Sequence, residues 1–203
     1  MRSGPGDEEH QHPAWWEERY LSGNTPWDTG ITPPEVVWLV ESGRVPTGWA
    51  LDLGCGSGVT SRHLASNGFR VIGVDLSLIA LKHAARLAAA ERLPCYFVRG
   101  SVQDFRFLRI DAALAVDIGC FHSLSPAERT SYVRSLGERV ISGGYYLLYT
   151  FVRPPHEQVS PEVGGLNVVP SDIGAFAPWF ALRCTAYGED RGRVSAWFLM
   201  QRT

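Results

Sequence analysis

The chain has 203 residues, of which 45% are hydrophobic and 20% charged, a composition typical of one globular domain with a substantial core. The net charge of −2 argues against a nucleic-acid or anionic-lipid partner, and the apolar runs are too short to span a membrane. No signal peptide is visible and the four cysteines are scattered, so we expect a cytoplasmic protein with reduced thiols. We expect a monomer or homodimer, and the scattered histidines suggest no metal site.

The N-terminal residues predict a disordered tail followed by a short helix. Residues 1–12 are polar and contain glycine and proline, which favours disorder. Residues 13–21 are rich in aromatic side chains. Within them Trp16 and Tyr20 lie four positions apart, so they would share one face of a helix.

A loop and a second helix follow. Residues 25–30 carry turn-forming residues at both ends, and this pattern predicts a loop. The sequence Thr32-Pro33-Pro34-Glu35 is typical of a capping box with proline at the first helical position, so we expect a helix over 33–43.

A glycine-rich turn is the most informative stretch of the chain. The apolar run 49–53 predicts a buried strand, and Gly54, Gly56 and Gly58 follow it at intervals of two. Glycines permit a sharp turn and let a ligand approach the backbone. The next helix, expected over 58–66, would direct its free N–H groups at the same ligand.

The spacing of these glycines separates two cofactor classes. A dinucleotide fingerprint needs Gly-x-Gly-x-x-Gly, and its third glycine would fall at Val59. No Gly-x-x-x-x-Gly-Lys-Ser/Thr sequence occurs either. The actual pattern, Asp52-x-Gly-x-Gly-x-Gly, resembles motif I of class I S-adenosylmethionine (AdoMet) methyltransferases. This resemblance implies that five residues form part of an AdoMet site: Asp52, Gly54, Cys55, Gly56 and Gly58.

The second predicted strand, 70–74, ends at Asp75, 21 residues after Gly54. An acid at the tip of this strand is placed to accept hydrogen bonds from both ribose hydroxyls of a nucleoside. Asp75 is not required as a helix cap, because Ser77 is a better cap for the helix expected over 78–92. We place Asp75 and its neighbour Leu76 in the cofactor site.

The turn after the third predicted strand, 95–99, departs from the family pattern. The family usually has Gly-Asp here, and the acid accepts a hydrogen bond from the adenine amino group. Ser101 stands at that position, and its hydroxyl accepts a weaker bond than a carboxylate would. Asp104 is an alternative acceptor, and Val102 would offer its backbone N–H to the ring.

The loop after the fourth predicted strand, 111–116, reads Asp117-Ile-Gly-Cys-Phe-His122 and matches the family version Asp-x-Gly-x-Phe-His. If the acceptor is a thiol, a base would help to form the thiolate. His122 is the leading candidate because histidine titrates near neutral pH, with a structural hydrogen bond as the alternative role. Asp117 is a second candidate for the base, or else orients the amino group of the cofactor. We interpret Cys120 as a packing residue.

The C-terminal third predicts one more helix, an irregular segment and three strands. The sequence Ser125-Pro-Ala-Glu128 is a second capping box and predicts a helix over 126–141, ended by Gly143 and Gly144. Residues 153–170 are rich in proline and glycine. We interpret them as part of a substrate wall from which His156 could reach the site. The remaining elements are strands over 145–151, 179–187 and 193–201, the last two joined as a hairpin.

Strands and helices alternate along this order. They predict an α/β protein with a doubly wound, seven-stranded, mostly parallel sheet, the Rossmann-like class I methyltransferase fold, with an antiparallel C-terminal hairpin. We expect one methyltransferase domain over 13–203, with N-terminal lid helices over 13–45.

The N-terminal strings Trp-Glu-x-x-Tyr and Pro-Trp-Asp-Thr-Gly-Ile-x-x-Pro-Glu resemble those of thiopurine, tellurite-resistance and thiol/halide methyltransferases. The resemblance implies that residues 13–45 fold over cofactor and substrate, with Trp27 near the sulfonium, where a ring face contributes roughly 0.5–2 kcal/mol. For Trp15 and Trp16 we favour packing roles. The implied acceptor is a small molecule, namely a thiol, a soft anion or an aromatic heterocycle. A non-catalytic AdoMet-binding module on the same fold is the alternative.

Overall fold

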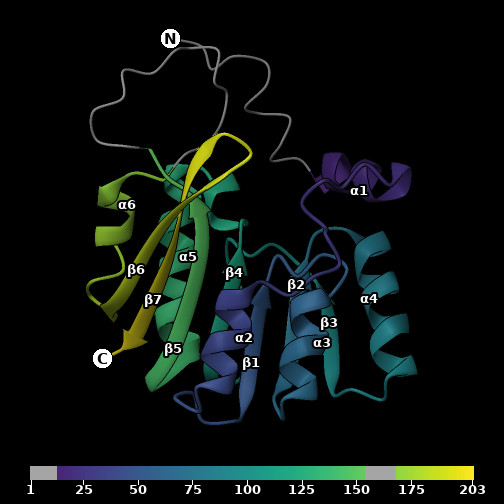
Figure 1. The fold of residues 1–203 in the computed structure, drawn as a ribbon, viewed down its shortest axis with the longest axis horizontal. Helices are drawn as coiled ribbons and strands as arrows, with labels where there is room; N and C mark the ends of the chain where they lie inside the picture. The colour runs from purple at the N-terminus through teal and green to yellow at the C-terminus, as the bar shows by residue number, and fades with distance from the viewer. Residues whose placement is uncertain (1–12, 154–167) are drawn as a thin grey trace.

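The computed structural model describes residues 13–153 and 168–203, so the predicted tail 1–12, His156 and most of the predicted substrate wall lie outside the described residues. A seven-stranded sheet in the order β3-β2-β1-β4-β5-β7-β6 forms its centre (Figure 1). The strands are β1 (Trp49–Leu53), β2 (Arg70–Asp75), β3 (Cys95–Arg99), β4 (Ala112–Ile118), β5 (Val140–Phe151), β6 (Phe180–Asp190) and β7 (Arg193–Arg202). The helices are α1 (Pro13–Ser22), α2 (Pro34–Glu41), α3 (Val59–Ser66), α4 (Leu78–Ala90), the 3₁₀ helix η2 (Phe121–Ser123), α5 (Pro126–Arg139) and α6 (Pro170–Gly174).

The sheet confirms the predicted doubly wound topology. Strands β1 to β5 run parallel, and β7 pairs antiparallel with both β5 and β6. The chain starts at β1, moves outward to β3, and then returns to place β4 on the other side of β1. The chain therefore reverses its direction of travel across the sheet at the neighbouring strands β1 and β4. Their carboxyl ends mark a topological switch point, where open α/β sheets bind their ligands.

Two hydrophobic cores hold the layers together, one on each face of the sheet. One core joins the sheet to α2 and α3 through Val36, Leu39, Leu64 and Ala65. The other packs α5 and the C-terminal region against the opposite face, and it is rich in aromatic side chains. Figure 1 shows α2 and α3 in front of the strands and α5 behind them. Burial on both faces explains why the parallel strands read as continuous apolar runs.

Two local predictions are wrong. Helix α2 has Pro33 at its N-cap and no side-chain cap, so the expected capping box with Thr32 does not form. Helix α5 ends at Arg139 and β5 begins at once, so Gly143 and Gly144 lie inside the strand. The β4–β5 register shifts between Ala112 and Leu114, and Gly143 has a φ of +79° within this irregular stretch. The two glycines thus allow an irregularity in a strand where the sequence pattern predicts a helix end.

Other local predictions are confirmed. Ser125 and Glu128 form a reciprocal capping box at α5, and the hydroxyl of Ser77 accepts from the Ala80 N–H at the start of α4. The short helix α6 was not predicted. Among the described residues, no helix combines the length and apolar character needed to cross a membrane.

Candidate active site

The glycine turn after β1 adopts the conformation that its sequence predicts. Gly54, Gly56 and Gly58 have φ values of +73°, +51° and +75°, which other residues rarely adopt. A Cβ at position 54 would lie 2.6 Å from the Cβ of Cys120, so Gly54 is also needed for close packing against the loop after β4. The turn is thereby held against the switch point.

The Asp75 carboxylate lies at the tip of β2 beside this turn. Its Oδ2 accepts from the N–H of Gly56 at 2.9 Å, and its Oδ1 accepts from the N–H of Ser77 at 2.8 Å. Burial raises the pKa of Asp75 above its ordinary value, and these backbone donors oppose that rise. The next residue, Leu76, offers its carbonyl oxygen to Nε of Arg99 at 3.0 Å. Two fixed backbone donors thus orient the carboxylate.

Asp52 and Cys55 lie in the interior, behind the turn. Oδ2 of Asp52 accepts from the hydroxyl of Ser61 at 2.6 Å, which ties β1 to α3, and burial raises the pKa of Asp52 to about 6. The Cys55 sulfur packs against Gly73 of β2, and burial raises the pKa of its thiol well above the usual range. Both side chains are placed to support the turn from within the fold.

The predicted adenine side has two polar candidates, and both already have protein partners. The Ser101 hydroxyl accepts from the N–H of Gln103 at 3.1 Å. The Asp104 carboxylate accepts from Nε of Arg106 at 2.9 Å, and this partner lowers the pKa of Asp104. The Val102 side chain is buried in the core. Ser101 keeps its own proton available as a donor, whereas Asp104 is committed to an arginine.

The carboxylate of Asp117 is fully buried, and three donors surround it. Oδ1 accepts from the N–H groups of Cys120 at 2.8 Å and Phe121 at 3.2 Å, while Oδ2 accepts from the hydroxyl of Tyr132 at 2.7 Å. The hydroxyls of Tyr132 and Tyr146 lie 3.0 Å apart. Burial raises the pKa of Asp117 to about 7. The side chain thus belongs to a buried network that shapes the loop after β4.

Substituting Asp117 with Asn is expected to stabilise the protein most at about pH 8 and by less than half as much at about pH 5. Because folding raises this pKa from 3.8 to about 7, the stability that the protonated Asp117 carboxyl contributes is complete below pH 3.8 and is lost as the pH rises from there through the folded value. Asparagine does not ionise; its Oδ1 can keep both N–H donors, and its amide can donate to Tyr132. The midpoint temperature of thermal unfolding, measured for Asp117→Asn at both pH values, tests this prediction. Asp111→Asn, a change at an exposed acid, is the control. A midpoint below that of the unaltered protein at both pH values would contradict the prediction.

His122 occupies η2, with its ring against Gly119 and Phe151. The N–H of Phe151 lies 3.4 Å from Nδ1 of His122 and donates to it, so the ring proton is assigned to Nε2. Burial lowers the pKa of His122 to about 3, helped by the charges of Arg193 and Arg129. The expectation of a ring that titrates near neutral pH therefore does not hold. The neutral ring can instead offer the Nε2 proton as a hydrogen-bond donor.

Cys120, beside His122, is a packing residue in this structure. Its side chain fills the space left by the missing side chain of Gly54. Burial raises the pKa of its thiol well above the usual range, so it remains protonated at neutral pH.

Helix α1 and the loop after it, which the sequence predicted to form a lid, carry an aromatic cluster. Trp27 stacks on Trp15, with ring centroids 6.0 Å apart, and meets Trp16 edge-on at 5.3 Å. The guanidinium of Arg19 lies 5.1 Å and 5.3 Å from the ring centroids of Trp15 and Trp27. A side chain of the β6–β7 hairpin also reaches the loop, since Arg191 donates to the carbonyl of Pro26. The loop is thus tied to both α1 and the sheet.

Tyr20 brings this cluster to the glycine turn. Its hydroxyl accepts from Nε1 of Trp27 at 3.2 Å and occupies the space into which a side chain at Gly56 would project. On the same side of α1, Glu17 contacts the start of α4. Neither Tyr20 nor Glu17 was predicted as a site residue, although the Trp-Glu-x-x-Tyr spacing places them three positions apart on one helical face.

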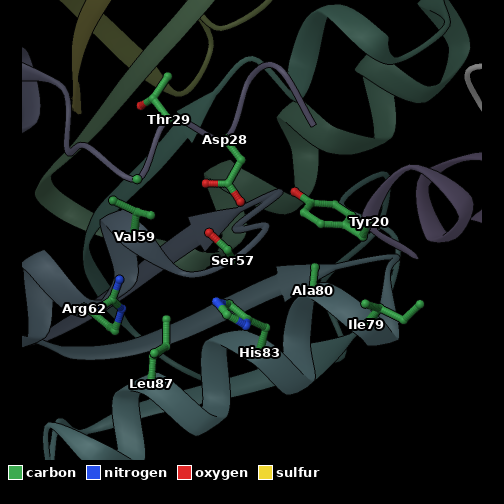
Figure 2. A pocket seen from close by; sticks show the side chains of 11 residues that line it. Tyr20, Asp28, Thr29, Ser57, Val59, Arg62, Ile79, Ala80, His83 and Leu87 are labelled. Atoms are coloured by element: carbon green, nitrogen blue, oxygen red, sulfur yellow. The ribbon is translucent and has the colours of Figure 1, made fainter. Parts of the chain in front are cut away.

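A cavity of about 450 Å³ lies between the loop after α1 and the α3–α4 pair. Figure 2 shows Asp28, Tyr20 and Ser57 on one side and His83 with Arg62 on the other. Ser57 belongs to the glycine turn, so the cavity borders the predicted cofactor site. Among the described residues, no group of three or more His, Cys, Asp and Glu side chains is arranged to hold a metal ion.

The fold is a Rossmann-like α/β domain, and its switch point carries the candidate ligand site. A protein-family model for a methyltransferase domain matches residues 50–144 of the chain. Thiocyanate methyltransferase 1 of Brassica oleracea is 32% identical over 72% of this chain and 65% of its own length. An uncharacterized methyltransferase of Schizosaccharomyces pombe, C750.03c, is 30% identical over 50% of this chain and 70% of its own. The chain belongs to the methyltransferases, and its fold is the Rossmann-like class I methyltransferase fold.

Further relatives and solved structures are similar as well. The 2-heptyl-1-hydroxyquinolin-4(1H)-one methyltransferase of Mycobacteroides abscessus is 28% identical over 70% of this chain. The matches span 65% and 66% of the Brassica and Mycobacteroides proteins, slightly under two thirds of each. The solved structure of TehB from Haemophilus influenzae superposes with a TM-score of 0.74 at 18% sequence identity. The match covers 92% of this chain and 67% of the TehB chain. NodS of Bradyrhizobium japonicum, solved with S-adenosylhomocysteine, superposes with a TM-score of 0.77 at 14% sequence identity, and the match covers 95% of this chain and 99% of the NodS chain.

Proposed function

We propose that this protein transfers a methyl group from AdoMet to a small-molecule acceptor. The observation that carries the proposal is the Asp75 carboxylate, which the backbone N–H groups of Gly56 and Ser77 fix beside three glycines with positive φ. Each carboxylate oxygen has a second lone pair, so Asp75 can still accept from two ribose hydroxyls. An acid beside a glycine turn at a switch point is the arrangement that binds nucleoside cofactors.

The remaining contacts to the cofactor are assigned by position. The backbone of the turn formed by Gly54, Gly56 and Gly58 would face the methionine part, and Leu76 would lie beside the ribose. Ser101 and the backbone of Val102 would meet the adenine. Bound AdoMet would supply a methyl on a sulfonium, and a lone pair of the acceptor would form the new bond as the methyl–sulfur electron pair returns to sulfur, which would leave S-adenosylhomocysteine. Because that sulfur is a good leaving group, the chain's task is to hold the acceptor in line and exclude water.

The charges near His122 favour an acceptor that binds as an anion. Arg193 lies with its guanidinium 3.7 Å from the ring centroid of Phe151, which packs on His122. Its positive charge lowers the pKa of His122, and the same charge would lower the pKa of a bound thiol or phenol. The Nε2 proton of His122 can donate to such an anion. We therefore propose a thiolate, thiocyanate or aryl oxide as the acceptor, in keeping with the names of the Brassica and Mycobacteroides relatives.

No general base is assigned within the described residues. His122 stays neutral and presents a donor, while Asp117 is fully buried and already accepts from three donors inside the fold. Asp117 is therefore proposed as a positioning residue for the loop that carries His122. An Asp117→Asn variant is expected to keep its rate within about threefold, because it keeps the loop contacts. A loss of more than about a hundredfold would restore the base role to Asp117.

The function is tested by binding and turnover with the purified protein. Calorimetry with AdoMet and S-adenosylhomocysteine is expected to show one site for each. Methyl transfer to iodide, thiocyanate, hydrosulfide, an aryl thiol and a hydroxyquinoline, read as S-adenosylhomocysteine formed, is expected to favour acceptors that are anions at the assay pH. Binding without turnover on any acceptor would favour the non-catalytic alternative, and absence of binding would contradict the proposal.

A further inference from the structure

The carboxylate of Glu17 joins the lid helix to the first turn of α4, 60 residues further along the chain. Oε2 of Glu17 accepts from the hydroxyl of Ser77 at 2.6 Å and lies 3.3 Å from the backbone nitrogen of Ile79, which donates to it. The Ser77 bond is the main cause of a lowered pKa for Glu17, so the group is ionised at neutral pH. The Ser77 hydroxyl also accepts from the Ala80 N–H, so Glu17 orients the cap of α4.

Helix α1 is not held in place by fully buried apolar side chains. None of its residues is buried, so its docking depends on a few polar contacts and on the tryptophan cluster. Two side chains on one face of α1 reach the rest of the domain: Glu17 at Ser77, and Tyr20 one turn later at Gly56. A charge-assisted bond of this kind is among the stronger contacts available to an exposed helix.

These two anchor points are the residues that hold Asp75. Gly56 and Ser77 donate their backbone N–H groups to the two oxygens of the Asp75 carboxylate, and they are also the residues that Tyr20 and Glu17 touch. We propose that Glu17 and Tyr20 form a two-point clamp, through which docking of the lid helix fixes the Asp75 carboxylate for the cofactor ribose. Glu17 is thus a positioning residue that acts through Ser77. This inference rests on the proposed binding of AdoMet.

The first test compares Glu17→Ala, Glu17→Gln and the matched control Glu18→Ala, an exposed acid next in the chain. Loss of a hydrogen bond to a charged group predicts about tenfold weaker binding of S-adenosylhomocysteine for Glu17→Ala. Glu17→Gln keeps a neutral acceptor, so about half of that loss in free energy is expected to be recovered. Glu18→Ala is expected to bind as the unaltered protein does. Equal affinities for all four proteins in calorimetry would overturn the proposal.

A double-mutant cycle separates this role from a general loss of stability. If Glu17 acts through Asp75, Glu17→Ala is expected to weaken binding by less than about twofold once Asp75 is already asparagine. If α1 contributes to affinity only by its own contact with the cofactor, the two effects multiply. Multiplying effects would therefore refute the action through Asp75. Thermal unfolding of each variant shows whether it is folded, and Tyr20→Phe, which keeps the ring, probes the second anchor.

A measurement without ligand keeps this inference separate from the proposed function. Acrylamide quenching of tryptophan fluorescence reports the summed exposure of the seven tryptophans, of which Trp15, Trp16 and Trp27 form the cluster on α1 and its loop. It is expected to rise in Glu17→Ala and to stay unchanged in Glu18→Ala. If the unaltered protein binds neither AdoMet nor S-adenosylhomocysteine, the proposed function fails, and quenching alone decides whether Glu17 docks the lid. Unchanged quenching in Glu17→Ala would refute that docking role.

Discussion

Substituting Asp75 with Ala is expected to weaken AdoMet binding by about 1–3 kcal/mol, the loss associated with hydrogen bonds to a charged group. The carboxylate is held by Gly56 and Ser77 with both oxygens oriented, so its removal deletes a preorganised acceptor for the ribose. An asparagine is not a mild replacement, because its NH₂ group would face a backbone N–H in either orientation.

Calorimetry with AdoMet measures this effect. The matched control is Asp111→Ala. It removes an exposed acid that lies just before β4 begins, at the amino-terminal ends of the parallel strands and so at the opposite end from Asp75. The control is expected to bind like the unaltered protein. An unchanged affinity for Asp75→Ala would remove Asp75 from the ribose site and would leave its carboxylate a purely structural role.

Substituting His122 with Ala is expected to lower turnover about 10–100-fold, by a factor that stays constant across about pH 6–9. The pKa of His122 lies at about 3, so its ring does not change charge in this range. Its Nδ1 accepts from the N–H of Phe151, and the remaining Nε2 proton would hold the acceptor. The variant therefore loses a positioning donor and not a base.

The pH profile of kcat/KM with an aryl thiol distinguishes the two roles. A base matters most where the free thiolate is scarce, so the base role predicts a loss that grows toward low pH. A parallel profile is expected here, and His122→Asn, which keeps a side-chain donor, is expected to recover part of the rate. A loss that shrinks as the pH rises would return His122 to the base role.

The sequence alone determined the parts of this protein that depend on neighbouring residues. The apolar run before Gly54, the glycine spacing and Asp75 at the end of the next strand are local patterns, and each folds as its pattern indicates. The alternation of strands and helices was enough to predict the sheet topology, because parallel crossovers have one favoured hand. The boundary between α5 and β5 was not predictable in this way, since Gly143 is typical of a helix end and of an irregular strand alike.

Only the tertiary structure decided how the site's charged and polar side chains behave. The low pKa of His122 arises from burial and from Arg193, 71 positions away, and the high pKa of Asp117 arises from burial in the fold. The contact between Glu17 and Ser77 spans 60 positions. Burial and Coulomb interactions depend on distance in space and not on separation along the chain. The sequence therefore pointed to His122 and Asp117 without revealing their protonation states, and it gave no sign of the contact between Glu17 and Ser77.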